Sequence, residues 1–112
     1  MNYRIRAAVA ADIDLLAHFN HAMAKESEDK PLDLDRLKAG LAGLIERPAD
    51  GHYLIAEAAR GTPAGALMLT FEWSDWRNGR FWWIQSVYVA PQFRRQGVYR
   101  ALHGHVRTAA RA

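Results

Sequence analysis

The chain has 112 residues, half of them hydrophobic and 24% charged, which is the size and composition of one globular domain. It contains no cysteine, which excludes disulfide bonds, thiolate metal sites and a cysteine nucleophile, and suits the reducing cytoplasm where we expect the protein. The net charge of +3 favours anionic ligands only slightly, and no apolar run reaches membrane-spanning length.

The first half of the chain predicts one strand and two helices. Apolar and basic residues alternate over 3–7, which is typical of a short strand. Asp12 is placed to cap a first helix, and the polar stretch 25–31 that follows this helix is interpreted as a loop. Asp33 can cap a second helix, whose apolar residues recur at helical spacing.

The second half predicts three strands and one helix. Residues 52–58, 64–73 and 81–89 are rich in strand formers and are separated by turn sequences, one of which contains Asn-Gly. A last helix is predicted over 98–111 from the spacing of its apolar residues. The order β-α-α-β-β-β-α predicts a single α+β domain over residues 1–112.

The junction between the last strand and the last helix carries the clearest chemical signal. Pro91 ends the strand because it has no N–H to donate, and Gly97 permits a turn that a side chain would obstruct. The first turn of a helix presents free N–H groups at the positive end of its dipole, and Arg94, Arg95 and Arg100 add charge there. This combination favours a phosphate, although the G-x-x-x-x-G-K-S/T and G-x-G-x-x-G patterns are both absent.

The same junction resembles a family signature. Residues 94–99 read Arg-Arg-Gln-Gly-Val-Tyr, which is similar to the Gln/Arg-x-x-Gly-x-Gly/Ala signature of the GNAT superfamily of N-acetyltransferases. Tyr99 departs from it, because Gly or Ala is usual there. The resemblance implies acetyl-CoA as cosubstrate, with its pantetheine arm paired to the backbones of Val87 and Val89. It places the pyrophosphate on the loop formed by Arg94, Arg95, Gln96, Gly97, Val98, Tyr99 and Arg100.

The resemblance also covers the order of elements. It implies a GNAT-like fold with a mainly antiparallel sheet flanked by helices, in which the family's C-terminal strand, helix and hairpin are lacking. The strand that ends at Val89 and the last helix would then lack part of their cover. Because an open strand edge recruits another chain, we expect a homo-oligomer that forms through these two elements.

Acetyl transfer needs a polarised carbonyl and a neutral amine, whereas a free alkylamine is mostly protonated at neutral pH. The resemblance assigns the carbonyl to the backbone N–H of Val87. Residues 82–85, where many family members have an acidic residue, contain none. Glu72 is therefore our first candidate for the catalytic base, followed by Asp75 and then by Glu26 and Glu28. Two alternatives stay open: the base acts through a water molecule, or all four carboxylates are solvated surface groups without a catalytic role.

Four tryptophans lie within residues 73–83, beside acidic and basic side chains. Their rings could bind a cationic amine through cation–π contacts. Alternatively, they cover the core and pair across strands, and we favour this second role for at least two of them. The candidates for substrate binding are Glu26, Glu28, Trp73 and Asp75.

The leading hypothesis is an N-acetyltransferase that moves an acetyl group from acetyl-CoA to a primary amine of a small molecule or peptide. The alternative is a non-catalytic, truncated module that binds CoA or only self-assembles. The histidines show no metal-ligand spacing, so no metal is expected. No membrane partner is expected, and nucleic acid ranks low at this net charge.

Overall fold

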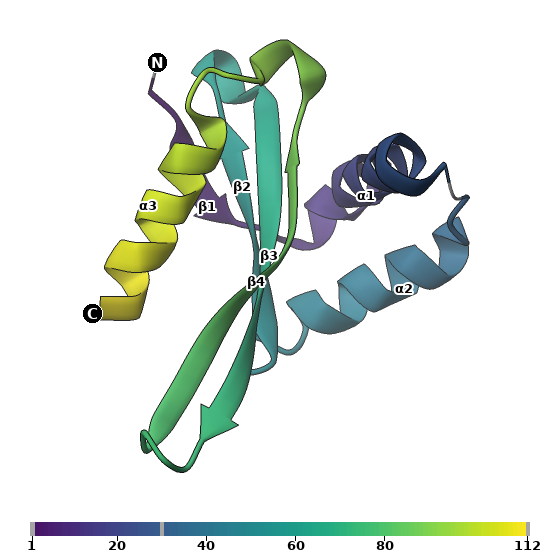
Figure 1. Cartoon of the computed structure of the whole chain (residues 1–112). Coiled ribbons are helices and arrows are strands. Elements are labelled where there is room, and N and C mark those ends of the chain that lie inside the picture. The colour runs from purple at the N-terminus through teal and green to yellow at the C-terminus, as the bar shows by residue number, and fades with distance from the viewer. Residues whose placement is uncertain (1, 30, 112) are drawn as a thin grey trace.

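Four strands form one antiparallel sheet in the order β1-β2-β3-β4, and three α-helices flank it (Figure 1). These are the elements of the computed structural model, which describes residues 2–29 and 31–111. The α+β architecture and the order β-α-α-β-β-β-α expected from the sequence are confirmed. The elements are β1 (Arg4–Ala7), α1 (Ile13–Glu28), α2 (Leu34–Ile45), β2 (Gly51–Glu57), β3 (Pro63–Ser74), β4 (Gly79–Val89) and α3 (Val98–Arg111).

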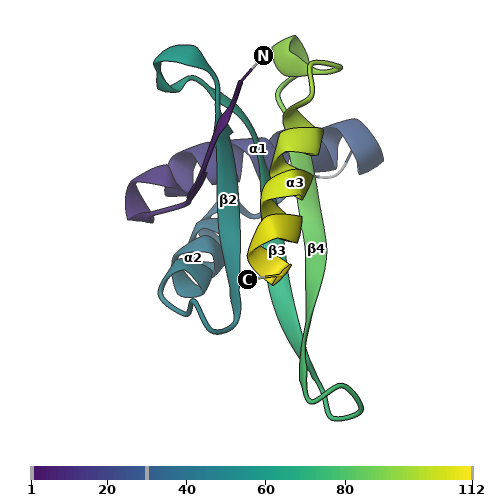
Figure 2. The same ribbon diagram turned by 90° about the vertical axis from the view of Figure 1, so that its left-hand side faces the viewer.

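The helices cover opposite faces of the sheet, as the two views show (Figures 1 and 2). On one face, Leu16 and Phe19 of α1 and Leu41 of α2 are buried with Tyr53 and Ile55 of the sheet. On the other face, α3 buries three residues one turn apart against the sheet, which are Val98, Leu102 and Val106. The periodicity that predicted α3 is thus its packing stripe.

A β-bulge in β4 decides which side chains face α3. Leu67 of β3 is opposite Val87, but Leu69 is opposite Ile84, so Gln85 and Ser86 together face one residue of β3. The extra residue keeps Ile84 and Val87 on the same side of the sheet. Ser86 consequently lies on the α1 and α2 side, where it lines two pockets.

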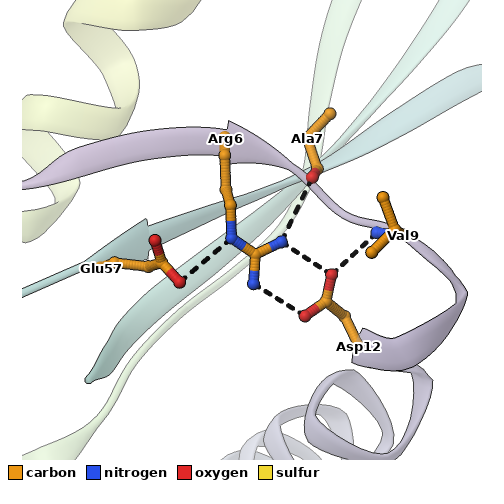
Figure 3. Close-up of polar contacts among 5 residues, drawn as sticks. All are labelled: Arg6, Ala7, Val9, Asp12 and Glu57. Carbon is orange, nitrogen blue, oxygen red and sulfur yellow. Dashed lines mark hydrogen bonds and ion pairs between the residues drawn. The ribbon is translucent and has the colours of Figure 1, made fainter. Parts of the chain in front are cut away.

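A partly buried ion pair fixes the N-terminal strand to its neighbours (Figure 3). The guanidinium of Arg6 donates two hydrogen bonds of 2.8 Å to the carboxylate of Asp12, and its Nε lies 3.1 Å from Oε2 of Glu57. The backbone N–H of Val9 donates to the same Asp12 carboxylate at 2.8 Å. The hydrogen bonds from Arg6 lower the pKa of Asp12, so this carboxyl stays ionised. The network joins β1, β2 and the start of α1.

Two local predictions need correction. Asp12 directly precedes α1, but its carboxylate accepts from Val9 and Arg6 and makes no cap bond to the helix. The stretch 25–31 was expected to be a loop, whereas α1 continues through Glu28 and ends at Asp29 in a left-handed conformation. Lys and Glu are good helix formers, so a helix can extend beyond its last apolar residue. The cap at Asp33 is confirmed, because its Oδ1 accepts from the N–H of Arg36 at 3.2 Å.

Within the described residues, no helix is both long enough and apolar enough to cross a membrane.

The substitution Asp12→Asn tests the ion pair at almost constant shape. We expect it to lower the free energy of unfolding at pH 7 by about 1–3 kcal/mol, because Arg6 loses a buried charged partner. Because the folded-state pKa of Asp12 is lowered, this stabilisation is present above its unfolded pKa of about 3.9 and is lost as the pH falls through the lower folded value. Urea denaturation at several pH values measures both effects.

The matched control is Asp14→Asn in the first turn of α1, which removes an exposed ion pair with Lys38 of α2. This change should alter the free energy of unfolding by less than about 1 kcal/mol. Equal effects of the two substitutions would contradict the structural role given to Asp12.

Candidate functional site

The loop that connects β4 to α3 forms a pocket at the first turn of the helix. A short 3-10 turn over Pro91–Phe93 is followed by residues 94–97, and the N–H of Ala101 bonds to the carbonyl of Gly97 at 3.0 Å as the helix begins. The pocket has a volume of about 190 Å³. Its lining is Val89, Phe93, Arg94, Arg95, Gly97, Val98, Tyr99 and Arg100. Nine residues were predicted to bind the cofactor, and seven of them line this pocket. The other two are Val87 and Gln96.

The backbone of this loop turns through two left-handed residues. Arg95 has φ +63° and Gly97 has φ +83°. A Cβ added to Gly97 would meet nothing within 4 Å, so the glycine is required by its backbone conformation and not by lack of space. The turn leads directly into the first turn of α3, whose free N–H groups attract an anion.

Arg94 anchors the loop to two other elements. Its Nε donates to the carbonyl oxygen of Val89 at 3.0 Å, and its Nη2 donates to Oε1 of Glu26 at 2.7 Å. The hydroxyl of Tyr88 donates to the other oxygen of Glu26 at 2.9 Å. Hydrogen bonds from Arg94 and then from Tyr88 lower the pKa of Glu26, so its carboxylate is negative at neutral pH.

The outer edge of β4 exposes the backbone groups predicted to hold the pantetheine arm. Among the described residues, β4 pairs only with β3. The N–H of Ala90 bonds to the carbonyl of Ala64 on β3 at 2.8 Å. Because an antiparallel ladder alternates, the backbones of Val87 and Val89 then point away from β3. Their polar groups are therefore directed to the open edge, on the side of the loop.

Tyr99 lies on the first turn of α3 and lines the pocket, with its ring 5.7 Å from that of His103. Its side chain is about half exposed, at 47%. Gln96 is the one residue of the predicted loop outside the lining. Its carbonyl accepts from the hydroxyl of Tyr3 at 2.9 Å, which ties the loop to the N-terminus of the sheet.

The other predicted site residues lie apart from this pocket. Glu72 is opposite Phe81 and accepts a hydrogen bond from the indole of Trp83 at 3.1 Å. It is five residues along β3 from the partner of Val87, which corresponds to roughly 16 Å. Asp75 lies in the turn beyond β3, and Trp73 is 62% exposed on the same hairpin.

Only one of the predicted carboxylates is brought to the loop. Glu26 contacts Arg94, whereas Glu28 ends α1 and is exposed.

The tryptophans divide in their roles. Trp82 packs against the core on the α3 side and on the ring of Phe71, while Trp76 is 96% exposed.

The sequence did not indicate a second, larger hollow between α2 and the sheet. Its volume is about 590 Å³, and its polar residues include Asn20, Tyr53 and Ser86. The Asn20 amide donates to the Tyr53 hydroxyl at 3.2 Å. Burial raises the pKa of this tyrosine. The sequence offered one signal for this hollow, the polar Asn20, which directly follows the apolar Phe19 of the first predicted helix.

Comparison with known proteins agrees with this geometry. A sequence model of the Acetyltransferase (GNAT) family matches residues 13–112. The chain belongs to the GNAT acetyltransferase family. The GNAT resemblance found in the sequence is thereby confirmed, and acyl transfer from acetyl-CoA is the chemistry of this family.

Solved structures support the same fold. A possible acetyltransferase from Clostridium difficile 630 is 39% identical, with a TM-score of 0.89, over 97% of this chain and 71% of that one. A probable acetyltransferase is 26% identical, with a TM-score of 0.84, over 96% and 71% of the two chains. A predicted acetyltransferase of Clostridium acetobutylicum, crystallised with acetyl-CoA, shares the fold at 19% identity and a TM-score of 0.79, over 98% and 74%. No curated protein matched the chain.

The substitution Gly97→Ala tests the backbone of the loop. We expect it to lower the free energy of unfolding by about 1–2 kcal/mol, because a residue with a Cβ is strained at φ +83°. The control is Gly104→Ala within α3, where there is open space and an ordinary helical backbone, and which should raise the stability by up to about 1 kcal/mol. Thermal or urea denaturation of both variants measures the difference. If both substitutions changed the free energy of unfolding in the same direction, this would contradict the left-handed backbone conformation assigned to Gly97.

Proposed function

We propose that the protein is an N-acetyltransferase that moves the acetyl group of acetyl-CoA to a primary amine of a small molecule or peptide. The observation that carries the proposal is the pocket at the start of α3, which combines a left-handed turn, free helix N–H groups and three arginines. These features suit the pyrophosphate of a CoA thioester. The crystal structure of the C. acetobutylicum protein with acetyl-CoA supports the same cosubstrate.

Each part of the site has a role in this proposal. The loop from Arg94 to Arg100 holds the pyrophosphate, and the open edge at Val87 and Val89 pairs with the pantetheine amides. The N–H of Val87 stabilises the negative charge that develops on the thioester carbonyl oxygen. The cosubstrate supplies an activated acetyl group. The amine nitrogen bonds to the carbonyl carbon and the carbon–sulfur bond breaks. The proton that the amine loses passes through water to the departing thiolate, which leaves as free CoA.

Glu26 is better placed than Glu72 to influence the acceptor. Its ionised carboxylate lies at the loop and attracts a cationic amine, although its lowered pKa makes it a weak base. Glu72 cannot contact an amine held at Val87 in this conformation, because roughly 16 Å along the strand exceeds the length of its side chain. Glu28, Trp73 and Asp75 remain candidates only for an acceptor long enough to extend beyond the loop.

A CoA-binding module without catalysis is the second candidate. It is favoured by residues 82–85, which contain no carboxylate where many family members have an acidic residue. Turnover separates the two proposals, because a non-catalytic module binds acetyl-CoA but releases no free CoA in the presence of amines.

Self-association through β4 and α3 also remains a proposal, as does a cytoplasmic location. The open edge of β4 can pair with a strand of another copy or with the pantetheine arm. A strand of another copy and the pantetheine arm cannot pair with Val87 and Val89 at the same time. A dimer formed there would therefore dissociate, or change its contacts, when acetyl-CoA binds.

Calorimetric titration with acetyl-CoA tests the cofactor pocket. We expect binding in the micromolar range, and at least about tenfold weaker binding for Arg94→Ala, which removes a charged donor and the anchor of the loop. The control Arg107→Ala removes the same charge from an exposed position on α3 outside the pocket lining. It should bind within about twofold of the unmodified chain. Equal affinity of all three proteins would count against the proposed site.

A further inference from the structure

The larger hollow lies on the opposite side of the sheet from α3. Figure 1 shows α2 with its C-terminal end beside the sheet and its N-terminal end away from it, so the two surfaces diverge. We call the resulting hollow of about 590 Å³ the α2 wedge. Its lining is Asn20, Leu32, Asp33, Arg36, Leu37, Gly40, Leu41, Leu44, Tyr53, Met68 and Ser86. This volume is within the range of small-molecule sites.

The walls of the α2 wedge are mostly apolar. Leu37 and Leu44 of α2 and Met68 of β3 are half-buried, so part of each apolar side chain is open to the hollow. The charged members of the lining, Asp33 and Arg36, are exposed at the N-terminal end of α2, and the backbone of Arg36 already occupies one oxygen of Asp33. The walls thus favour an apolar body over an extended polycation.

Neutral polar groups converge at one end of the wedge. The hydroxyl of Tyr53 accepts from the amide of Asn20 at 3.2 Å, and Ser86 lines the same hollow. Burial raises the pKa of Tyr53, so its hydroxyl stays protonated at neutral pH. These hydroxyl groups can accept a hydrogen bond from an amine without supplying a charge.

This polar end is adjacent to the proposed reaction centre. Ser86 belongs to the bulge of β4, and the next residue is Val87, whose N–H we assign to the thioester carbonyl. A group bound beside Ser86 would therefore lie next to the residue whose N–H we assign to the thioester carbonyl. The apolar surroundings also disfavour the charged form of an amine, which lowers its pKa and supplies part of the work of a base.

We propose that the α2 wedge binds the acceptor, and that the acceptor is a primary amine carried on an apolar group, with its nitrogen at Ser86 and Tyr53. This inference rests on the proposed acetyl transfer. It names the acceptor class and a site that the sequence did not indicate, in place of the tryptophan hairpin.

A pair of glycines on α2 provides the test. A Cβ at Gly40 would meet nothing within 4 Å and Gly40 lines the wedge, so the side chain of Gly40→Leu begins in open space and occupies part of the hollow. Gly43 is outside the lining, and a Cβ there would approach only the guanidinium of Arg47, at 3.6 Å. Gly43→Leu is thus the matched control on the same helix, with the same gain in helix propensity.

The experiment measures steady-state acetylation of phenethylamine, hexylamine and spermidine, together with the affinity for acetyl-CoA. We expect kcat/KM to be at least tenfold higher for the two apolar amines than for spermidine. Gly40→Leu should raise the KM for phenethylamine at least tenfold, and Gly43→Leu should change it less than twofold. Acetyl-CoA affinity should stay the same in both variants. Preference for spermidine, or equal KM values for the two variants, overturns the inference while the proposed function stands.

A second readout does not depend on turnover. Titration of the methyl-labelled chain with phenethylamine should shift the signals of Leu37, Leu41 and Met68, and Gly40→Leu should abolish these shifts. If acetyl-CoA does not bind, the proposed function fails, and these shifts still show whether the wedge takes an apolar amine. Unchanged methyl signals overturn the inference. Signals that move with protein concentration but not with amine assign the wedge to a second copy of the chain and overturn it as well.

Discussion

The packing of α3 against one face of the sheet is the interaction on which the cofactor pocket depends. Val98, Leu102 and Val106 are buried there, so the axis of the helix and the direction of its first-turn N–H groups are fixed by apolar contacts. The bulge in β4 contributes to the same core, because it keeps Ile84 and Val87 on the α3 side. The loop then needs only one glycine at a left-handed position to connect strand and helix. Arg94 anchors this loop to Glu26 and Val89, and Arg95, Arg100 and the first-turn N–H groups of α3 remain to serve a ligand at the pocket.

The two faces of the sheet divide the proposed chemistry. The pocket at the start of α3 is basic, and the α2 wedge is mostly apolar with neutral hydroxyl groups at one end. β4 runs between them, and its bulge brings Ser86 to one side and Val87 to the other. A polar cosubstrate and an apolar acceptor could thus approach the same two residues from opposite sides. Desolvation of the amine in the wedge would reduce the need for a strong base, and the described residues that line the two pockets supply none.

Local patterns predicted most of the fold, and long-range contacts explain what they missed. The strands, the Asn-Gly turn and α3 follow from periodicity and turn residues within a few positions, as does the glycine of the loop. The end of α1 did not follow, because its last turn has no apolar residue to mark it. The contact between Glu26 and Arg94 joins positions 68 residues apart. Glu72 was chosen as a candidate base because residues 82–85 contain no carboxylate, whereas the register separates it from Val87 along the hairpin. The α2 wedge depends on the angle of a helix, which no pattern of residues encodes locally.

The most direct test of the account is the ¹⁵N–¹H spectrum of the folded chain during titration with acetyl-CoA. The largest shifts should occur at the backbone N–H groups of residues 95–100 and of Val87 and Val89, where we propose that the pyrophosphate and the pantetheine arm bind. The tryptophan hairpin and the C-terminal half of α3 should be little affected. Shifts centred on the hairpin, or a folded protein with no shifts at millimolar acetyl-CoA, would contradict the assignment of this loop as the cofactor site.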